Sequence, residues 1–251
     1  MAVSVEEPLR NVLSMMERAG FEINQDVRVV VDEKLAFMGY TSRRWQSHII
    51  VVSGHAVKSP MLEGLLAHEL SHVYRNTTGH PSHSESLIAN LMRLFIESHN
   101  LDRDYEQEIL HQVINHVQDL YADDIAIKVL AANRGTAPRV EQLGEFFLGW
   151  IKEEPARSGA RRRDQWINAS ILLNNSFAVS NMERHKIAER LIEKAKMSNQ
   201  RFLSRIKASA AGRFSYFNAF MVSLKEDISE SEFREQMKEY LQSFLDVVGN
   251  I

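Results

Sequence analysis

Segments typical of β-strands occur in one short part of this chain, between residues 27 and 52. Three stretches rich in β-branched and aromatic residues lie there, at 27–31, 35–40 and 48–52. Before this region, at 4–19, and through most of the chain after it, apolar residues recur three and four positions apart, which is the spacing of helices. The pattern predicts an α+β fold, with a small sheet near the N-terminus and an all-helical second half.

Capping residues mark two of the predicted helix starts. Ser59 followed by Pro60 predicts a helix that runs to about Asn76, because proline at the first helical position gives up no needed hydrogen bond. Ser82 followed three residues later by Glu85 has the form of a capping box and predicts the start of the next helix.

A break in the helical pattern suggests the domain organisation. Residues 131–139 contain Gly135 and Pro138 and lack periodicity. We therefore expect one domain at 1–133 and an α-helical module at 134–251.

A second break, at 153–163, contains three consecutive arginines. We expect a solvated loop there, in preference to a phosphate-binding patch built on Arg161, Arg162 and Arg163. The other helices are expected at 103–130, as one helix or two, and at 140–153, 163–178, 181–197, 198–224 and 229–248.

The composition excludes several classes of protein. The 251 residues carry a formal net charge of -3 and a pI of about 6.4, so no overall field favours nucleic acid or an acidic membrane. Cysteine is absent, so disulfides and thiolate ligands are excluded, and a metal would be held by nitrogen and oxygen. The first residues lack the pattern of a secretory signal, and the apolar runs are shorter than the roughly 20 residues that cross a bilayer. We expect a soluble, cytoplasmic protein without membrane insertion.

The sequence His68-Glu69-Leu70-Ser71-His72 is an HExxH motif. On a helix its two histidines lie one turn apart on the same face, so both can bind one ion, and neutral imidazole nitrogens suit zinc. Zinc lowers the pKa of a bound water to about 7, and a neighbouring carboxylate can then take the proton. The motif predicts His68 and His72 as zinc ligands and Glu69 as the general base of a hydrolase.

Catalytic zinc normally has three protein ligands, so a third is needed. His80 and His83 are candidates close to the motif. A metzincin arrangement is disfavoured, because Arg75 stands three residues after His72, where such a site has glycine.

Better candidates lie on a later helical segment, where Asp119, Ala122, Asp123 and Ala126 form the pattern D-x-x-A-D-x-x-A. Together with the HExxH motif, this pattern resembles the gluzincins, especially the small soluble minigluzincins and the HtpX-like peptidases, whose second metal-binding helix commonly reads E-x-x-A-D-x-x-A. The resemblance covers about residues 25–130 and implies a zincin-like fold with one zinc ion per chain. It implies Asp119 as the third ligand and Asp123 as the carboxylate that supports a ligand histidine.

Aspartate in place of glutamate at residue 119 departs from the gluzincin pattern. Because aspartate is one methylene shorter, either the helix lies closer to the ion, or Asp123, His116 or His80 completes the ligand set. General chemistry agrees with the supporting role of Asp123, since metal-bound imidazoles usually donate their other N–H to a carboxylate or carbonyl.

The leading hypothesis is a zinc-dependent metallopeptidase that acts on peptide or unfolded protein. The segment 47–53, directly before the HExxH helix, is expected to offer a sheet edge for an extended substrate. His116, Tyr74 and Tyr121 are alternative donors to the developing oxyanion, and the sequence does not choose among them.

Two other functions compete with this hypothesis. A non-enzymatic regulatory or interaction protein could keep a zincin scaffold, and the aspartate at residue 119 favours this alternative. A DNA-associated protease of the SprT kind ranks last, because its zinc ribbon needs cysteines and the chain has none. No nucleic-acid partner is expected, and the helical second half is a candidate surface for a protein partner.

Overall fold

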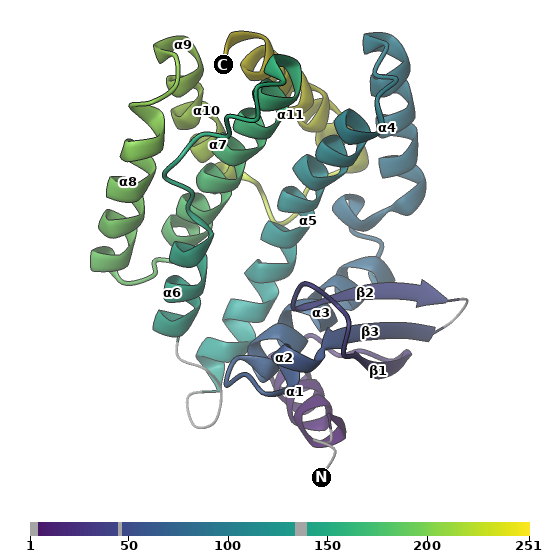
Figure 1. Cartoon of the computed structure of the whole chain (residues 1–251). Helices are drawn as coiled ribbons and strands as arrows, with labels where there is room; N and C mark the ends of the chain where they lie inside the picture. The colour runs from purple at the N-terminus through teal and green to yellow at the C-terminus, as the bar shows by residue number, and fades with distance from the viewer. Residues whose placement is uncertain (1–4, 45–46, 134–139) are drawn as a thin grey trace. The chain divides into compact units, whose positions relative to one another are not determined.

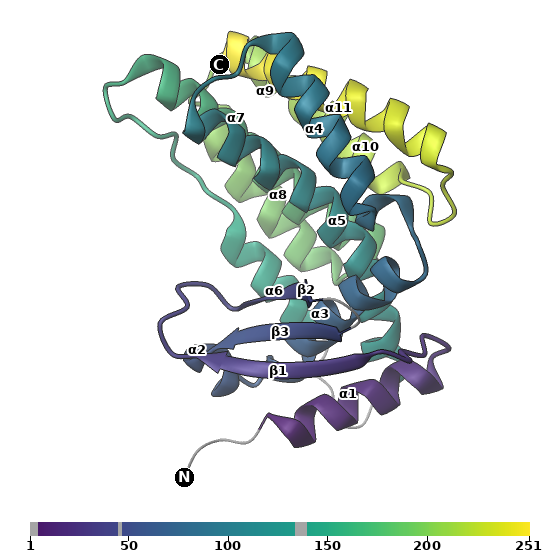
Figure 2. The ribbon, with the colours of Figure 1, turned by 90° about the vertical axis from the view of Figure 1, so that its right-hand side faces the viewer.

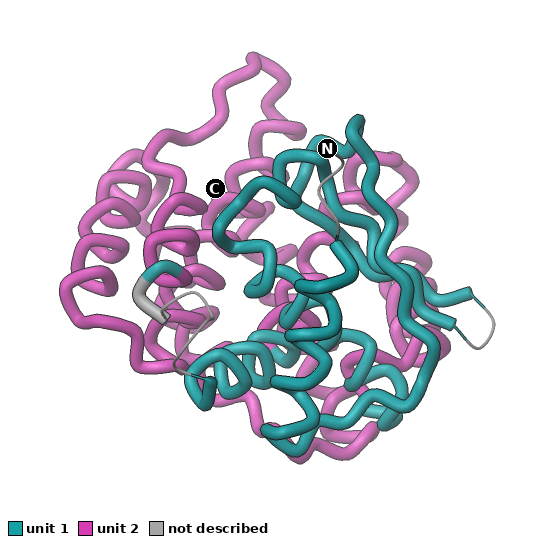
Figure 3. Tube along the Cα trace, turned by 90° about the horizontal axis from the view of Figure 1, so that it is seen from below, with its two compact units in different colours: residues 1–80, 121–142 teal, residues 81–120, 143–251 magenta. Residues whose placement is uncertain are grey.

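The computed structural model describes residues 5–44, 47–133 and 140–251 (Figure 1). The chain packs into two compact units, one formed by residues 1–80 and 121–142 and the other by residues 81–120 and 143–251 (Figure 3). The division falls inside the long helix α5 (Asp104–Ala132), which is continuous through it. The architecture is α+β, with a small three-stranded sheet and a helical module.

The two units do not follow the order of the sequence, unlike the expected division at residue 133. Residues 81–120 pack with the later helices because their apolar and polar groups find partners there. For example, the buried Tyr240 hydroxyl donates to the Val113 carbonyl oxygen, 3.1 Å away. The division into 1–133 and 134–251 stays a prediction, and most of the break at 131–139 lies outside the described residues.

The first unit contains the sheet, whose strands are β1 (Asp26–Asp32), β2 (Gly39–Arg44) and β3 (Ser47–Ser53). The strand order is β1-β3-β2, and β3 is antiparallel to β2. Figure 2 shows that β1 and β3 run parallel. β3 is therefore the central strand, and the expectation that segment 47–53 forms a sheet edge is wrong. Its alternate residues Ile50 and Val52 are fully buried, which explains why the most apolar strand takes the centre.

Two of the three predicted strands are confirmed, and the third is shifted along the chain. The segment 35–40 was expected to be extended, but a turn follows β1. In this turn the Asp32 carboxylate accepts a hydrogen bond from the Lys34 N–H, and the Asp32 carbonyl oxygen accepts one from the Leu35 N–H. β2 begins only at Gly39. The polar residues of β2 concealed it, because they lack the apolar alternation of a strand.

Three helices complete the N-terminal part of this unit: α1 (Glu6–Arg18), the short α2 (Gly54–Val57) and α3 (Leu62–Thr77). α1 packs against α3 and buries Val12, Met15 and Met16. α3 starts later than the predicted Ser59, because the Ser59 hydroxyl accepts from the Met61 N–H within a turn that precedes the helix.

The second unit is helical. Besides its part of α5 and a 3-10 turn (Pro81–His83), it contains α4 (Glu85–His99), most of α6 (Val140–Trp150), α7 (Arg161–Arg184), α8 (Glu189–Leu203), α9 (Ala208–Ala211), α10 (Arg213–Ser223) and α11 (Glu230–Asn250). Region 103–130 is one helix, whereas α7 continues past the predicted break at 178. Among the described residues, no helix combines the length and apolar character needed to cross a membrane.

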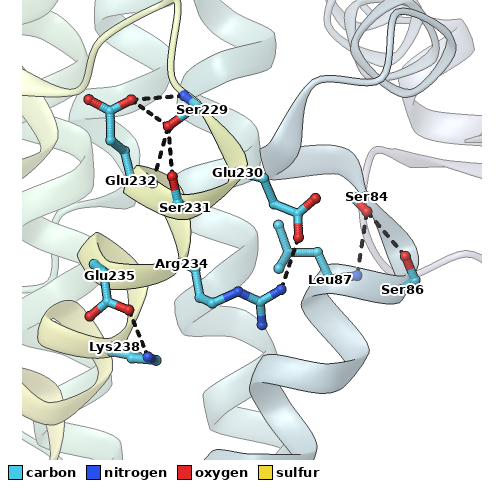
Figure 4. Close-up of polar contacts among 10 residues, drawn as sticks. All are labelled: Ser84, Ser86, Leu87, Ser229, Glu230, Ser231, Glu232, Arg234, Glu235 and Lys238. Carbon is cyan, nitrogen blue, oxygen red and sulfur yellow. Dashed lines mark hydrogen bonds and ion pairs between the residues drawn. The ribbon is translucent and has the colours of Figure 1, made fainter.

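Helix caps in this unit differ from the predicted one (Figure 4). The cap of α4 is Ser84, whose hydroxyl accepts from the Leu87 N–H, so the predicted capping box of Ser82 and Glu85 is wrong. The Ser82 hydroxyl contacts His83 Nδ1 instead, at 2.7 Å. A complete capping box begins α11, where Ser229 and Glu232 bond each other's backbone N–H groups.

The arginine run belongs to the first turn of α7 and not to the predicted loop. Arg162 pairs with Glu106, whose side chain is fully buried, at 2.7 Å, and Arg163 lies 5.9 Å from the centre of the Tyr105 ring. All three arginines remain exposed, as expected, and Arg162 also supplies the partner that the buried Glu106 carboxylate requires.

Candidate metal centre

The HExxH motif lies on α3, and its two histidines converge. His68 Nε2 and His72 Nε2 are 3.0 Å apart, and their ring centres are 4.6 Å apart. Two nitrogens that each bind a tetrahedral zinc ion at about 2.0–2.1 Å lie about 3.4 Å from one another. The pair therefore needs a change of only a few tenths of an ångström to hold one ion.

A third ligand atom comes from Asp119 on α5. Ligand atoms of His68, His72 and Asp119 all lie within 4.8 Å of one another. The three residues form a candidate metal-binding triad, with each side chain partly exposed and so open to an incoming ion. The triad has the nitrogen and oxygen donors that the lack of cysteine requires, and this donor set suits zinc.

Asp123 lies one turn after Asp119 on the same helix and contacts His68. Its Oδ1 atom is 2.7 Å from His68 Nδ1, and the carboxylate is largely buried, with 10% of the side chain exposed. A carboxylate at this distance favours the imidazole form with the proton on Nδ1, which leaves the Nε2 lone pair directed at the metal position. Both aspartates of the D-x-x-A-D-x-x-A pattern thus lie close to the histidines of the motif.

A buried arginine anchors this part of α5 to α3. Arg75 Nε donates to the Tyr121 carbonyl oxygen at 3.2 Å, and its guanidinium lies 5.7 Å from the centre of the Tyr121 ring. Arg75, which stands where a metzincin has glycine, therefore holds α5 at Tyr121 against α3.

Glu69 is buried, with 4% of its surface exposed, and one hydroxyl holds its carboxylate. Thr41 Oγ1, on β2, donates to Glu69 Oε2 at 2.7 Å. Sequence analysis missed Thr41, because 28 residues separate it from Glu69 and β2 has no strong strand pattern. This hydrogen bond fixes the position of one carboxylate oxygen of Glu69.

The other histidines considered as ligands have different surroundings. The His80 ring packs on Tyr121 with centres 4.5 Å apart, and buried His83 contacts Ser82. The His116 ring lies 5.0 Å from that of Phe177, and burial lowers the pKa of His116, while Asp119 and Asn174 oppose this shift.

The three candidate oxyanion donors are also held in structural contacts. Tyr121 is fully buried, the Tyr74 ring packs edge-on against Phe21, and the Nδ1 atom of His116 is buried. None of the described contacts distinguishes one of them as an oxyanion donor.

Comparison with known proteins assigns a family to the chain. The profile of DUF5781, a family of unknown function, matches residues 2–246. The chain belongs to the DUF5781 family. A search of curated proteins finds no match, and a search of solved structures finds none either.

Proposed function

We propose that this protein is a zinc-dependent metallopeptidase of the gluzincin type, with one zinc ion per chain. The observation that carries the proposal is the convergence of His68, His72 and Asp119, next to a buried carboxylate on the same helix as the two histidines. A metal site with three protein ligands keeps a coordination position for water, which is the arrangement of catalytic zinc. The zincin-like fold is part of this proposal.

The residues around the site suit peptide hydrolysis. Zinc, when bound, would polarise the peptide carbonyl and activate a water molecule. Asp123 holds the His68 ring through Nδ1, which would leave Nε2 to bind the ion. Thr41 bonds Oε2 of Glu69, which leaves Oε1 to take the proton of the attacking water and pass it to the leaving amine.

An extended substrate would pair with β2, an edge strand, and not with the central β3. The hydrogen bond from the Ser53 N–H to the Met38 carbonyl oxygen, 2.9 Å long, fixes which residues of this antiparallel pair bond each other. Hydrogen-bonded and non-bonded residue pairs alternate along an antiparallel ladder. The backbone N–H and C=O groups of Gly39, Thr41 and Arg43 therefore point away from β3. The backbone groups of Thr41 thus lie at the sheet edge, while its hydroxyl donates to Glu69. This arrangement suits binding of a peptide beside the general base.

Metal content and cleavage test this proposal. Purified protein should hold about one zinc per chain and cleave an unstructured protein, as a site with three protein ligands requires. The Glu69→Gln variant should lose cleavage and keep its zinc, whereas Glu63→Gln, on the same helix, should behave like the parent protein.

Three results would contradict the proposal. Cleavage by Glu69→Gln would remove this residue from the mechanism, and absence of bound zinc would remove the metal site. Zinc binding without turnover on varied substrates would favour the non-enzymatic alternative, to which the aspartate at position 119 gives weight.

A further inference from the structure

A basic groove lies at one end of the sheet in the first unit, where β2 ends and β1 and β3 begin. Its volume is about 820 Å³. It is lined by strand ends and by the end of α3, through Asn24, Gln25, Asp26, Arg28, Arg43, Arg44, Ser47, His48, Ile49, Asn76 and Thr77. This set of residues defines the basic groove. The arrowhead of β2 in Figure 1 marks the strand end that contributes Arg43 and Arg44.

Positive charge in the basic groove is only partly neutralised. Asp26 is the single acidic residue among the described residues that line it, and Arg28 Nε bonds this carboxylate at 3.0 Å. Among the described residues, the contact of the Arg43 side chain is a long one, 3.4 Å, to the neutral Asn76 side chain. Arg44 forms no ion pair with the described residues. Within the described part of the chain, the exposed guanidinium groups of Arg43 and Arg44 on β2 therefore have no carboxylate partner.

Guanidinium groups match the planar geometry of carboxylates and phosphates, and they bind both through paired N–H donors. Neutral polar side chains, among them that of Asn76, also line the groove. The groove's chemistry thus selects a negatively charged ligand, although the whole chain has a net charge of -3.

The path of β2 connects the basic groove to the candidate metal centre. Thr41 bonds Glu69, and Arg44 follows three residues later on the same strand, which is about 10 Å at the rise of an extended chain. A peptide paired with the open edge of β2 would reach from one to the other.

We propose that the basic groove binds the carboxylate of an aspartate or glutamate in the substrate, about three residues from the cleaved bond, so that the enzyme prefers acidic peptides. This inference rests on the proposed peptidase function and names the substrate class for the same site. Arg43 and Arg44 are its specificity-determining residues.

Two quenched-fluorescence peptides that differ only in glutamate or glutamine at the flanking positions test the inference. With zinc-loaded protein at low salt, kcat/KM for the glutamate peptide should exceed that for the glutamine peptide by about two- to five-fold, the upper part of the range expected for an exposed ion pair. Added salt should reduce this ratio, because exposed charges are screened. Arg44→Gln and Arg43→Gln should each lower the ratio, while Arg10→Gln, on the exposed face of α1, should leave it unchanged.

Cleavage and anion binding are separable in this design. The same peptides, labelled for fluorescence anisotropy, are titrated with Glu69→Gln protein, in which binding does not depend on turnover. Acid-selective binding that Arg44→Gln weakens, without any cleavage by the parent protein, would support the groove and contradict the peptidase. Cleavage with equal kcat/KM for both peptides would support the peptidase and overturn the groove. Inorganic phosphate that displaces the glutamate peptide at much lower concentration than free glutamate would overturn the assignment to a peptide carboxylate.

Discussion

Replacing Asp123 tests how the candidate metal centre is organised. The Asp123 carboxylate lies 2.7 Å from His68 Nδ1, and the two side chains are only 10% and 24% exposed. Supporting hydrogen bonds of this kind typically change metal affinity by about 10- to 100-fold, which corresponds to about 1.4–2.7 kcal/mol. Asp123→Asn keeps an oxygen that can accept from Nδ1–H, so we expect the lower end of this range. Asp123→Ala removes the acceptor, so we expect the upper end.

Competition against a chromophoric zinc chelator measures these affinities. Asp102→Asn is the matched control, because Asp102 is exposed and precedes α5 in the chain. Asp119→Ala should weaken zinc binding more than Asp123→Ala does, since it removes a ligand and not its support. If Asp123→Ala bound zinc as tightly as the parent protein, the supporting role would be refuted. Unchanged affinity in Asp119→Ala would refute the triad.

Three further results are expected. Thr41→Val should lower kcat about ten-fold without changing zinc affinity, because it removes the charged hydrogen bond to Glu69. The control Thr78→Val should leave kcat unchanged. Equal kcat values for Thr41→Val and the parent protein would refute the role of Thr41. Zinc at about 100 times its Kd should stabilise the fold by about 2.7 kcal/mol, seen as a higher Tm that EDTA reverses, and a Tm indifferent to both would contradict specific binding. Ser229→Ala should lower the free energy of unfolding by about 1 kcal/mol at pH 7 in urea titrations. Hydrogen bonds from Ser229 lower the pKa of Glu232 from its ordinary 4.5. The contribution of this carboxylate to the free energy of unfolding should therefore be present above pH 4.5 and lost as the pH falls through the lowered pKa.

Much of the candidate metal centre follows from local spacing. His68 and His72 are four residues apart, and so are Asp119 and Asp123, so helical geometry alone puts each pair on one face. The α+β class also follows from local patterns, because alternation and helical periodicity are properties of short segments. The long helix α5 and the strand β3 were recognised for the same reason.

Features that depend on partners distant in the chain were not predicted. The order β1-β3-β2 makes β2 the edge strand near the metal centre, and neither its polar residues nor its place in the sequence indicated this. Thr41 approaches Glu69 only because β2 pairs with β3 and packs on α3. The helix cap at Ser84 and the pairing of Arg162 with buried Glu106 likewise depend on tertiary contacts.

The sequence by itself thus determined His68 and His72 as a candidate metal-binding pair, since ligand type and helical spacing are local properties. The tertiary structure decided which carboxylate lies near both histidines, which histidine Asp123 contacts, which hydroxyl donates to Glu69 and which strand is at the sheet edge. Those choices depend on the order of strands and on the burial of apolar side chains over long sequence separations, which local periodicity does not encode.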